Sequence, residues 1–361
     1  MSPKLKVGVL GATGMVGQRF VSLLDNHPWF DVTAVAASPA SAGKSYADAV
    51  AGRWTLPTAV PAAAARLTVG NASDIGAIAD QVDFVFCAVD MAKDATAKLE
   101  DDYARAETPV ISNNGAHRWT PDVPMMIPEI NADHAAVIES QRRRLGTRRG
   151  FVAVKPNCSI QSYVPAIHPV LGFGPTRIVV CTYQAISGAG KTFETWPEMV
   201  DNVIPFIKNE EEKSETEPHK IWGTISGGKI VAATTPVISA QCIRVPVTDG
   251  HMAAVSVAFE RKPSRDQILS AWKEYGGKPQ QLALPSAPRP FLQYFDDDSR
   301  PQTRLDRDAG RGQAVTIGRL RPDPVFDWRF VALSHNTVRG AAGGAVLTAE
   351  LLSAEGYLTA K

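Results

Sequence analysis

Residues 6–17 of this chain read KVGVLGATGMVG, and residues 15–28 continue as MVGQRFVSLLDNHP. The apolar run at the start has the composition of a buried strand, and the second segment has apolar residues at helical spacing. Glycines between a strand and a helix let the backbone approach a phosphate, and the first turn of the helix offers free N–H groups. An ordinary tight turn is the alternative, but this context favours a dinucleotide cradle formed by Gly11, Ala12, Thr13, Gly14, Met15, Val16 and Gly17.

The alternation of strands and helices continues through the first 150 residues. Further buried strands are predicted at FDVTAVAAS (30–38), QVDFVFCAVD (81–90) and TPVISNN (108–114), with helical or loop segments between them. Repeated β-α-β units build a parallel sheet with helices on both faces. The first part of the chain is therefore predicted to be an α/β domain.

The pattern changes at about residue 151, where longer strands with few helices between them begin. We expect these strands to form a mainly antiparallel sheet, in a second domain that the length of 361 residues also favours. They are TRIVVCTYQAIS (176–187), KIVAATTPVI (229–238), CIRVPVT (242–248), MAAVSVAFE (252–260) and GQAVTIGRLRP (312–322). The final segment, 336–356, is predicted to be a helix that packs back on the first domain. The charge-dense segment NEEEKSETEPH (209–219) is interpreted as a solvated loop or helix face.

The composition is that of an ordinary globular protein. Hydrophobic residues make up 44% and charged residues 21%, and the formal net charge of +1 gives no reason to expect a nucleic-acid or membrane-surface partner. No run approaches the roughly 18–20 apolar residues of a spanning helix, and no signal peptide is recognisable, so a cytoplasmic location is expected. The four cysteines are too few for a disulfide framework, and none has the spacing of a metal site.

The end of the second strand indicates which nicotinamide dinucleotide is used. An acidic residue there would hydrogen-bond the ribose hydroxyls and would repel a 2′-phosphate. The segment AASPASAGKSY has no acid but offers Ser38, Ser41 and Lys44, which favours NADP(H). The alternative is a polar surface loop, because serine is common in loops.

A cysteine stands at a break in the sequence VAVKPNCSIQS (152–162). Pro156 is badly placed for a central strand, so the strand should end there and a helix should begin at about Cys158. A thiol at a helix N-terminus has a lowered pKa, and the thiolate is the nucleophile. Most cysteines are inert core residues, as Cys87 and Cys181 in apolar runs are expected to be, but Cys158 has polar neighbours.

A nucleophilic cysteine beside a hydride carrier indicates one reaction class. The thiolate attacks an aldehyde, hydride leaves the thiohemiacetal, and phosphate cleaves the thioester; in reverse, an acyl phosphate becomes an aldehyde. This scheme needs an acid/base. His251, in a glycine-containing turn between two strands, is a candidate, and a surface histidine is the equally weighted alternative.

Seven segments spread along nearly the whole chain resemble aspartate-semialdehyde dehydrogenases, in particular the archaeal and fungal branch. They are VGVLGATGMVGQRF, PNCS, QAISGAGK, NVIPFI, EEEK, RVPVTDGH and ALSHNTVRGAAGGAV. The resemblance implies a Rossmann-type dinucleotide-binding domain (1–150 and 336–361) and an α+β catalytic and dimerisation domain (151–335). It implies NADPH-dependent reductive dephosphorylation of L-4-aspartyl phosphate to L-aspartate 4-semialdehyde and phosphate, in the biosynthesis of lysine, methionine, threonine and isoleucine. A homodimer or homotetramer is expected.

The same resemblance implies a role for each site residue. Cys158 is the nucleophile, His251 the general acid/base, and Gln184 orients the intermediate, while Asn157 and nearby backbone amides help to stabilise the oxyanion. Arg244 matches the arginine that binds the substrate α-carboxylate with a planar fork that lysine lacks. The remaining matches are Glu210 for the substrate ammonium, Lys213 and Arg118 for phosphate, and Ser187, Gly188 and Asn336 beside the nicotinamide.

Two departures from the family pattern lie near the expected site. Lys191 follows SGAG, where the branch commonly has SGAGYPG, and Gln161 follows the nucleophile in SIQSY. These residues keep a related acyl-thioester reductase, such as a malonyl-CoA reductase, as an alternative. A second alternative is a catalytically inactive dinucleotide-binding regulator, although Cys158, Gln184 and His251 are all retained.

Overall fold

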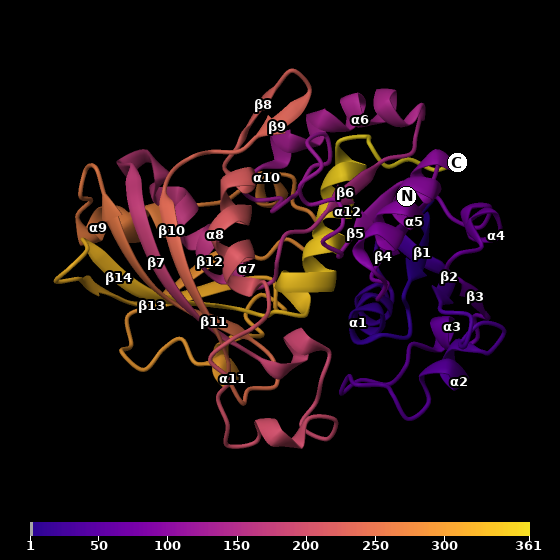
Figure 1. Cartoon of the computed structure of the whole chain (residues 1–361), viewed down its shortest axis with the longest axis horizontal. Coiled ribbons are helices and arrows are strands. Elements are labelled where there is room, and N and C mark those ends of the chain that lie inside the picture. Colours follow the sequence, from indigo (N-terminus) through magenta and orange to yellow (C-terminus); the bar gives the residue numbers. More distant parts are fainter. Residues whose placement is uncertain (1–2) are drawn as a thin grey trace.

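The computed structural model describes residues 3–361 and is built around two six-stranded sheets (Figure 1). Met1 and Ser2, which fall within the expected first domain, lie outside the described residues. The first sheet is entirely parallel, in the order β3-β2-β1-β4-β5-β6. Its strands are β1 (Leu5–Leu10), β2 (Phe30–Ala37), β3 (Val69–Asn71), β4 (Phe84–Cys87), β5 (Val110–Ser112) and β6 (Val152–Val154).

Helices connect these strands and cover the first sheet, as the β-α-β pattern predicts. They are α1 (Met15–Leu23), α2 (Tyr46–Val50), α3 (Ala62–Ala65), α4 (Ile75–Ala79), α5 (Lys93–Arg105), η1 (Ala132–Val137) and α6 (Ile138–Leu145). Strand β6 belongs to the first sheet. This sheet therefore extends beyond the expected domain boundary at residue 150, to Val154.

The second sheet is mixed, with three antiparallel and two parallel pairings, in the order β10-β7-β11-β14-β13-β12. The parallel first sheet and this mainly antiparallel second sheet together confirm the predicted fold class. The strands of the second sheet are β7 (Pro175–Gln184), β10 (Val237–Arg244), β11 (His251–Phe259), β12 (Leu292–Phe295), β13 (Val315–Pro322) and β14 (Trp328–Ser334). The other elements of this half are α7 (Ile160–Ile167), η2 (His168–Phe173), η3 (Ile186–Ala189), η4 (Pro197–Met199), α8 (Glu210–Ile221), β8 (Thr224–Ser226), β9 (Lys229–Val231), α9 (Arg265–Glu274), α10 (Lys278–Gln281) and α11 (Thr303–Asp306).

Two strand predictions in this half need correction. The segment 229–238 is not one strand: β9 pairs with β8 in a separate hairpin, and β10 begins at Val237. The predicted strand 242–248 is also wrong in its extent, because β10 ends at Arg244 and residues 245–248 lie outside any strand. Pro236, directly before β10, has no N–H to contribute to a ladder, which explains the break. Strands β8, β12 and β14 of this half, and β3 of the first sheet, were not among the predicted strands.

The C-terminal segment joins the two halves. A π-helical turn, η5 (Val338–Ala342), precedes α12 (Gly343–Ala354), which lies between the two sheets in Figure 1. Ala345, Val346 and Leu347 of α12 share a buried cluster with strand and helix residues of the first sheet, so the helix packs on the N-terminal half as predicted. Helix α7 is buried along its whole length and packs in the cluster that contains residues of both sheets.

Candidate active site

Three neighbouring strands of the second sheet bring Gln184, Arg244 and His251 together. Arg244 at the end of β10 pairs with Gln184 at the end of the parallel strand β7, and β11 runs antiparallel to β7 with Met252 opposite Tyr183. Because side chains alternate between faces, Gln184, Arg244 and His251 lie on one face at one end of the sheet. All three are buried.

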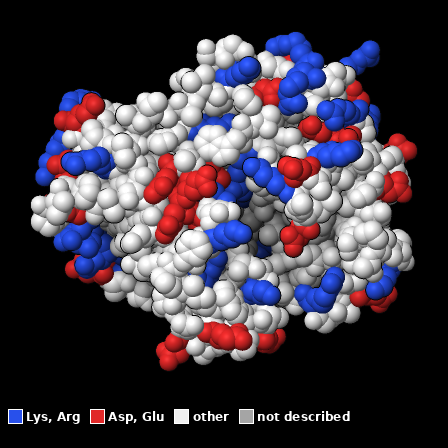
Figure 2. Space-filling model, in the orientation of Figure 1, with Lys and Arg blue, Asp and Glu red and all other residues white. Residues whose placement is uncertain are grey.

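Cys158 faces the same region from the first sheet. Strand β6 ends at Val154, before Pro156, and α7 begins at Ile160, so Cys158 lies in the short connection between strand and helix. It is partly exposed and lines a cavity of about 650 Å³ together with Gln184 and Arg244. The space-filling view shows the molecule hollowed between its two lobes (Figure 2).

Two glycines let the reactive groups approach closely. A Cβ on Gly340 of η5 would lie 2.9 Å from Cys158 Cβ, and a Cβ on Gly188 would lie 3.0 Å from both Arg244 Nη1 and His251 Nε2. Both glycines line the cavity. A side chain at either position would displace a residue of the site.

The expected lowering of the thiol pKa is wrong for this structure. Burial raises the pKa of Cys158, and the Glu210 carboxylate raises it further, against the opposing charges of Lys155, Arg118 and Arg244. The helix begins two residues later than expected, at Ile160, and Asn157 Oδ1 accepts the N–H of Ser159 at 2.8 Å. A nearby cation is therefore needed to stabilise the thiolate.

His251 is neutral in this environment. Burial, and then Arg244, lower the pKa of His251 to about 3. The N–H of Ala185 donates to His251 Nδ1 at 3.1 Å, while Nε2 has no hydrogen-bond partner among residues 3–361. The ring thus has one nitrogen free to bond a substrate atom.

The segment EEEK begins helix α8, and its residues make different contacts. Glu210 is buried at the cavity, where it accepts hydrogen bonds from Asn157 Nδ2 at 3.0 Å, Gln184 Nε2 at 3.2 Å and Lys213 Nζ at 2.8 Å. Burial alone would raise the pKa of Glu210, but Lys213, Asn157 and Gln184 hold it below its ordinary value. Glu211 instead accepts the backbone N–H of Cys242 in β10. The helix face, and not a solvated loop, thus places Glu210 and Lys213 in the site.

Arg244 and Arg118 are both buried arginines with free donor capacity. Arg244 Nη1 donates to the carbonyl of Ala185 at 2.6 Å. Arg118 Nε donates to the carbonyl of Lys155 at 3.1 Å, and Nη1 pairs with Glu217 at 2.9 Å. These contacts fix each guanidinium at the cavity wall and leave other N–H groups for an anionic ligand.

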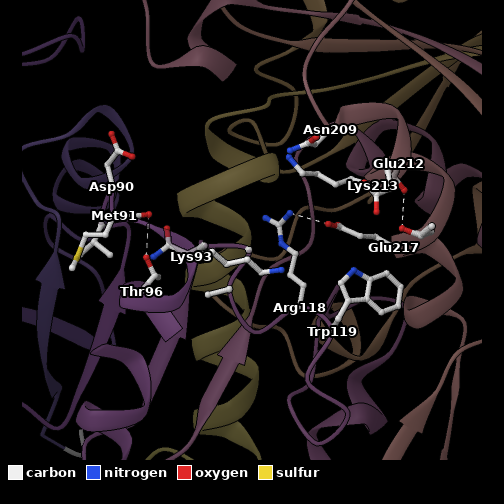
Figure 3. A pocket seen from close by; sticks show the side chains of 15 residues that line it. Asp90, Met91, Lys93, Thr96, Arg118, Trp119, Asn209, Glu212, Lys213 and Glu217 are labelled. Atoms are coloured by element: carbon white, nitrogen blue, oxygen red, sulfur yellow. Dashed lines mark hydrogen bonds and ion pairs between the residues drawn. The ribbon is translucent and has the colours of Figure 1, made fainter. Parts of the chain in front are cut away.

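Arg118 also borders a second hollow of about 470 Å³, which shares Asp90, Asn114, Gly115, Arg118 and Lys213 with the cavity of Cys158. Figure 3 shows the Arg118 guanidinium with its contact to Glu217 and with Lys213 nearby. Arg118 and Lys213 therefore form part of the boundary between the two hollows.

The glycine cradle fits a dinucleotide. Gly14 lies at the N-terminus of α1, and no side chain within residues 3–361 caps that end, so its first N–H groups are free for a phosphate. A Cβ on Gly11 would lie 2.3 Å from the carbonyl oxygen of Ala88, and Gly11 has a φ of +78°, so glycine is required there. Val16 of α1 lines the cavity of Cys158, which makes the cradle continuous with the thiol.

The other expected cofactor residues fall into two groups. Asn336 Nδ2 donates to Ser187 Oγ at 2.8 Å, and both residues line the cavity with Gly188. Ser38, Ser41 and Lys44 follow β2, at the carboxyl end of the first sheet, where the N–H of Ser41 donates to the carbonyl of Ser38 at 3.0 Å. This loop does not line the Cys158 cavity within the described residues.

The two departures from the family pattern do not line the cavity around Cys158. Lys191 is exposed, and Gln161 is buried in α7. Neither residue is among the described residues that line the cavity around Cys158. They give the cavity no new charge or amide.

Two residues at the site, Lys155 and Glu217, were not predicted from the sequence. Lys155 is buried and lines the cavity three residues before Cys158. Glu217 accepts from Arg118 and, at 2.6 Å, from the N–H of Asn157, so it joins α8 to the nucleophile segment. The position of Lys155 directly after a strand that ends beside the nucleophile was a usable signal, whereas that of Glu217 depended on the three-dimensional packing of α8.

No group of three or more His, Cys, Asp or Glu side chains in residues 3–361 has a metal-binding arrangement. Over the same residues, no helix is both long enough and apolar enough to cross a membrane. The four cysteines are free.

Comparisons with known proteins agree along the chain. The family models described as "Semialdehyde dehydrogenase, NAD binding domain" and "Semialdehyde dehydrogenase, dimerisation domain" match residues 6–138 and 167–339. Aspartate-semialdehyde dehydrogenase from Aspergillus fumigatus is 42% identical over 99% of this chain and 99% of its own. The enzyme of that name from Archaeoglobus fulgidus is also 42% identical, over 98% of this chain and 99% of its own.

A solved structure shows the same fold. The crystal structure of aspartate-semialdehyde dehydrogenase with NADP from Candida albicans superposes with a TM-score of 0.88 at 36% identity, covering 98% of this chain and 100% of that one. These fungal and archaeal relatives confirm the resemblance found in the sequence motifs. The chain therefore belongs to the aspartate-semialdehyde dehydrogenase family.

Proposed function

We propose that this protein reduces L-4-aspartyl phosphate with NADPH to L-aspartate 4-semialdehyde and phosphate, in the biosynthesis of aspartate-family amino acids. The observation that carries the proposal is a single cavity lined by Val16 of the glycine cradle, by Cys158, and by the charged side chains Arg244 and Glu210. A nucleophile, one end of the cradle for a hydride carrier and groups for an amino acid thus line one space.

The cavity residues supply the covalent chemistry. The sulfur of Cys158 attacks the acyl carbon, the C–O bond to phosphate breaks, and phosphate leaves an acyl thioester on Cys158. When bound, NADPH supplies the hydride that reduces this carbon. Collapse of the resulting thiohemiacetal reforms the thiolate and releases the aldehyde, with His251 exchanging the proton on the substrate oxygen. Asn157 donates to Glu210 in this structure, so backbone amides near Cys158 are the remaining oxyanion donors.

The charged side chains indicate where each charged group of the substrate binds. The buried Arg244 is the group for the α-carboxylate, because a guanidinium can bond a carboxylate with two parallel hydrogen bonds. Glu210 is the group for the ammonium, and Arg118 and Lys213 form the cationic wall for the phosphate. Ser187, Gly188 and Asn336 hold the nicotinamide side, and Ser38, Ser41 and Lys44 take the 2′-phosphate.

The direct test is phosphate-dependent reduction of NADP with L-aspartate 4-semialdehyde, run beside NADPH-dependent reduction of malonyl-coenzyme A. We expect turnover in the first assay only, because Lys191 and Gln161 leave the cavity unchanged. Turnover in the second assay alone would favour the malonyl enzyme. Turnover in neither assay, with a thiol of ordinary reactivity, would favour an inactive regulator.

The assembly, the location and the domain limits are proposed from the family resemblance. We propose a homodimer or homotetramer formed through the second sheet, whose outer face carries the exposed side chains of Val179, Tyr183 and Val237. The cytoplasm is the proposed location, consistent with four free cysteines. The proposed domains are residues 1–150 with 336–361, and 151–335, with β6 extending the first sheet to Val154.

A further inference from the structure

Helix α8 contributes Glu210 and Lys213 to the site, and a further acidic residue, Glu217, lies on the same face one turn after Lys213. We propose that Glu217 is a positioning residue for phosphate, whose carboxylate fixes the guanidinium of Arg118 relative to the backbone beside Cys158. This inference rests on the phosphate role of Arg118 in the proposed function. Glu217 itself has no part in the covalent steps given above.

The two oxygens of the Glu217 carboxylate accept hydrogen bonds from two different segments. Oε1 accepts from Arg118 Nη1 at 2.9 Å (Figure 3), and Oε2 accepts the backbone N–H of Asn157 at 2.6 Å. The Glu217 side chain is 2% exposed, so water does not compete for these charge-assisted bonds. Because the two oxygens of a carboxylate are a fixed distance apart, Glu217 sets the position of Arg118 relative to the residue before the nucleophile.

Arg118 has further contacts that fix the direction of its guanidinium. Nε donates to the carbonyl of Lys155 at 3.1 Å, and Nη2 lies 3.5 Å from the carbonyl oxygen of Asn113. Each contact uses one N–H, so one N–H on each Nη atom remains for an anion. The guanidinium is therefore oriented before phosphate binds, and a group held in this way needs little rearrangement to act on a ligand.

Helix α8 also holds the chain on the other side of the nucleophile. Ser159 Oγ lies 3.1 Å from Ser214 Oγ, and the Tyr163 hydroxyl donates to the carbonyl of Ser214 at 2.6 Å. The helix does not use that carbonyl, because Pro218, four residues later, has no N–H. Glu217 and Ser214 together thus fix the residues directly before and after the nucleophile.

This arrangement suits an acyl phosphate. In such a substrate one oxygen joins the acyl carbon to phosphorus, so the group that binds phosphate has to lie at a defined distance from the attacking sulfur. Lys213 is partly exposed on a flexible stem and pairs with Glu210 at 2.8 Å. Arg118, by contrast, is bonded through Glu217 to the segment that carries Cys158. The alignment of phosphate with the sulfur therefore depends on Glu217.

A purely electrostatic role for Glu217 predicts the opposite effect on phosphate. A carboxylate beside Arg118 reduces the positive potential at the anion site, so its neutralisation would tighten phosphate binding if charge alone mattered. Loss of positioning weakens phosphate binding instead. In Glu217→Gln the side chain keeps its size, but an amide has one acceptor oxygen, so Arg118 or the N–H of Asn157 loses its partner.

The test measures how inorganic phosphate protects Cys158 from alkylation by iodoacetamide, at constant ionic strength, with mass spectrometry of the peptide that contains residue 158. We expect Glu217→Gln to raise the phosphate concentration for half-protection about tenfold or more. Glu215→Gln is the matched control, because Glu215 of the same helix accepts the N–H of Ala240 in β10 and does not line the cavity of Cys158. This control should keep the parent value.

Two further variants separate positioning from charge and from general loosening of the fold. Glu217→Asp keeps the charge but shortens the side chain, so it should raise the half-protection concentration as Glu217→Gln does. Arg118→Gln should weaken protection by itself, and the addition of Glu217→Gln should weaken it no further, because Glu217 acts through Arg118. NADP affinity should be retained in the Glu217 variants.

The outcomes distinguish this role from the proposed function. Phosphate protection that is unchanged or tighter in Glu217→Gln, or weakened equally in Glu215→Gln, would overturn the inference, as would a further loss in the double variant. A parent that phosphate does not protect would also contradict it. Weaker protection confined to the Glu217 and Arg118 variants would support it even without turnover of L-aspartate 4-semialdehyde, because the assay uses no aspartyl substrate.

Discussion

At the scale of single residues, Glu210 organises the polar side of the site. Its carboxylate accepts from Asn157, Gln184 and Lys213, which come from three different segments of the chain. The carboxylate is therefore held ionised and in place before any substrate arrives. In the proposed binding mode, a substrate ammonium would share this carboxylate with Lys213.

Arg244 provides a test of substrate recognition at this scale. Arg244→Lys keeps the positive charge but loses the planar pair of donors, so the KM for L-aspartate 4-semialdehyde should rise about 10- to 100-fold, from the loss of about 1.5–3 kcal/mol. The measurement is steady-state kinetics with phosphate and NADP held saturating, and Lys191→Met, at an exposed lysine that does not line the cavity, serves as the charge-removal control. An unchanged KM would refute the assignment of Arg244 to the carboxylate.

The chemistry of individual residues was readable from the sequence where it depended on local context. The polar neighbours of Cys158 and the turn around His251 marked both residues, and the cavity contains Cys158. The thiol pKa was not readable, because its direction depends on burial and on Glu210, which is 52 positions away (210 − 158). Lys155 was not predicted to be a site residue, because a lysine near the end of a strand is ordinarily exposed.

At the scale of elements, the site depends on strand register and on small residues in η5. The pairing of Arg244 with Gln184 determines that both face the cavity, since a one-residue slip would turn each side chain to the opposite face. Gly340 has no side chain, so the backbone of η5 can approach Cys158 Cβ without displacing it.

Gly340→Ala should therefore reduce turnover without unfolding the protein. The added methyl group would lie 2.9 Å from Cys158 Cβ and must displace the nucleophile, so kcat should fall at least about tenfold. Gly76→Ala in α4, where a Cβ would meet nothing within 4 Å, is the matched control and should retain kcat. Equal kcat values in the Gly340→Ala variant and the parent would show that the close approach is unimportant.

The sequence predicted most elements of the fold because their hydrophobic periodicity is strong. Strands β1, β2, β4, β5 and β6 of the parallel sheet and the C-terminal helix were recognisable in this way, whereas the three-residue strand β3 was not. Strand β14 and the break before β10 were missed, since the first depends on pairing with β11 and β13, and the second on a hairpin formed by β8 and β9. Such long-range pairings leave little trace in a local sequence pattern.

At the scale of the whole molecule, the outer face of the second sheet predicts the assembly. Val237 is 64% exposed and Val179 is 44% exposed on this face, although both lie in regular strands. The double variant Val179→Lys/Val237→Lys should shift the protein toward monomers, because like charges would face each other across a symmetric interface. Analytical ultracentrifugation measures the change. Val325→Lys, in the loop between β13 and β14, is the control, and an oligomer that survives the double variant would contradict this interface.

The buried histidines predict how stability depends on pH. Burial lowers the pKa of His251 to about 3 and that of His335 to about 4, so unfolding takes up protons as the pH falls below about 6.5. Stability present at pH 7 is therefore lost progressively between about pH 6.5 and pH 4, by about 1.4 kcal/mol per pH unit for each such histidine. His335→Asn should show a shallower fall in unfolding free energy, measured by denaturant titration at several pH values. An identical slope in the variant would count against a neutral buried His335.

In the proposed reaction, Cys158 carries the acyl group inside the shared cavity. The most direct measurement is mass spectrometry of the protein after incubation with L-aspartate 4-semialdehyde and NADP in the absence of phosphate. We expect an aspartyl thioester on the peptide containing Cys158, which disappears when phosphate is added. We expect no adduct in Cys158→Ala, which should still bind NADPH but show no turnover. An adduct on another cysteine, or turnover in Cys158→Ala, would contradict the proposed reaction.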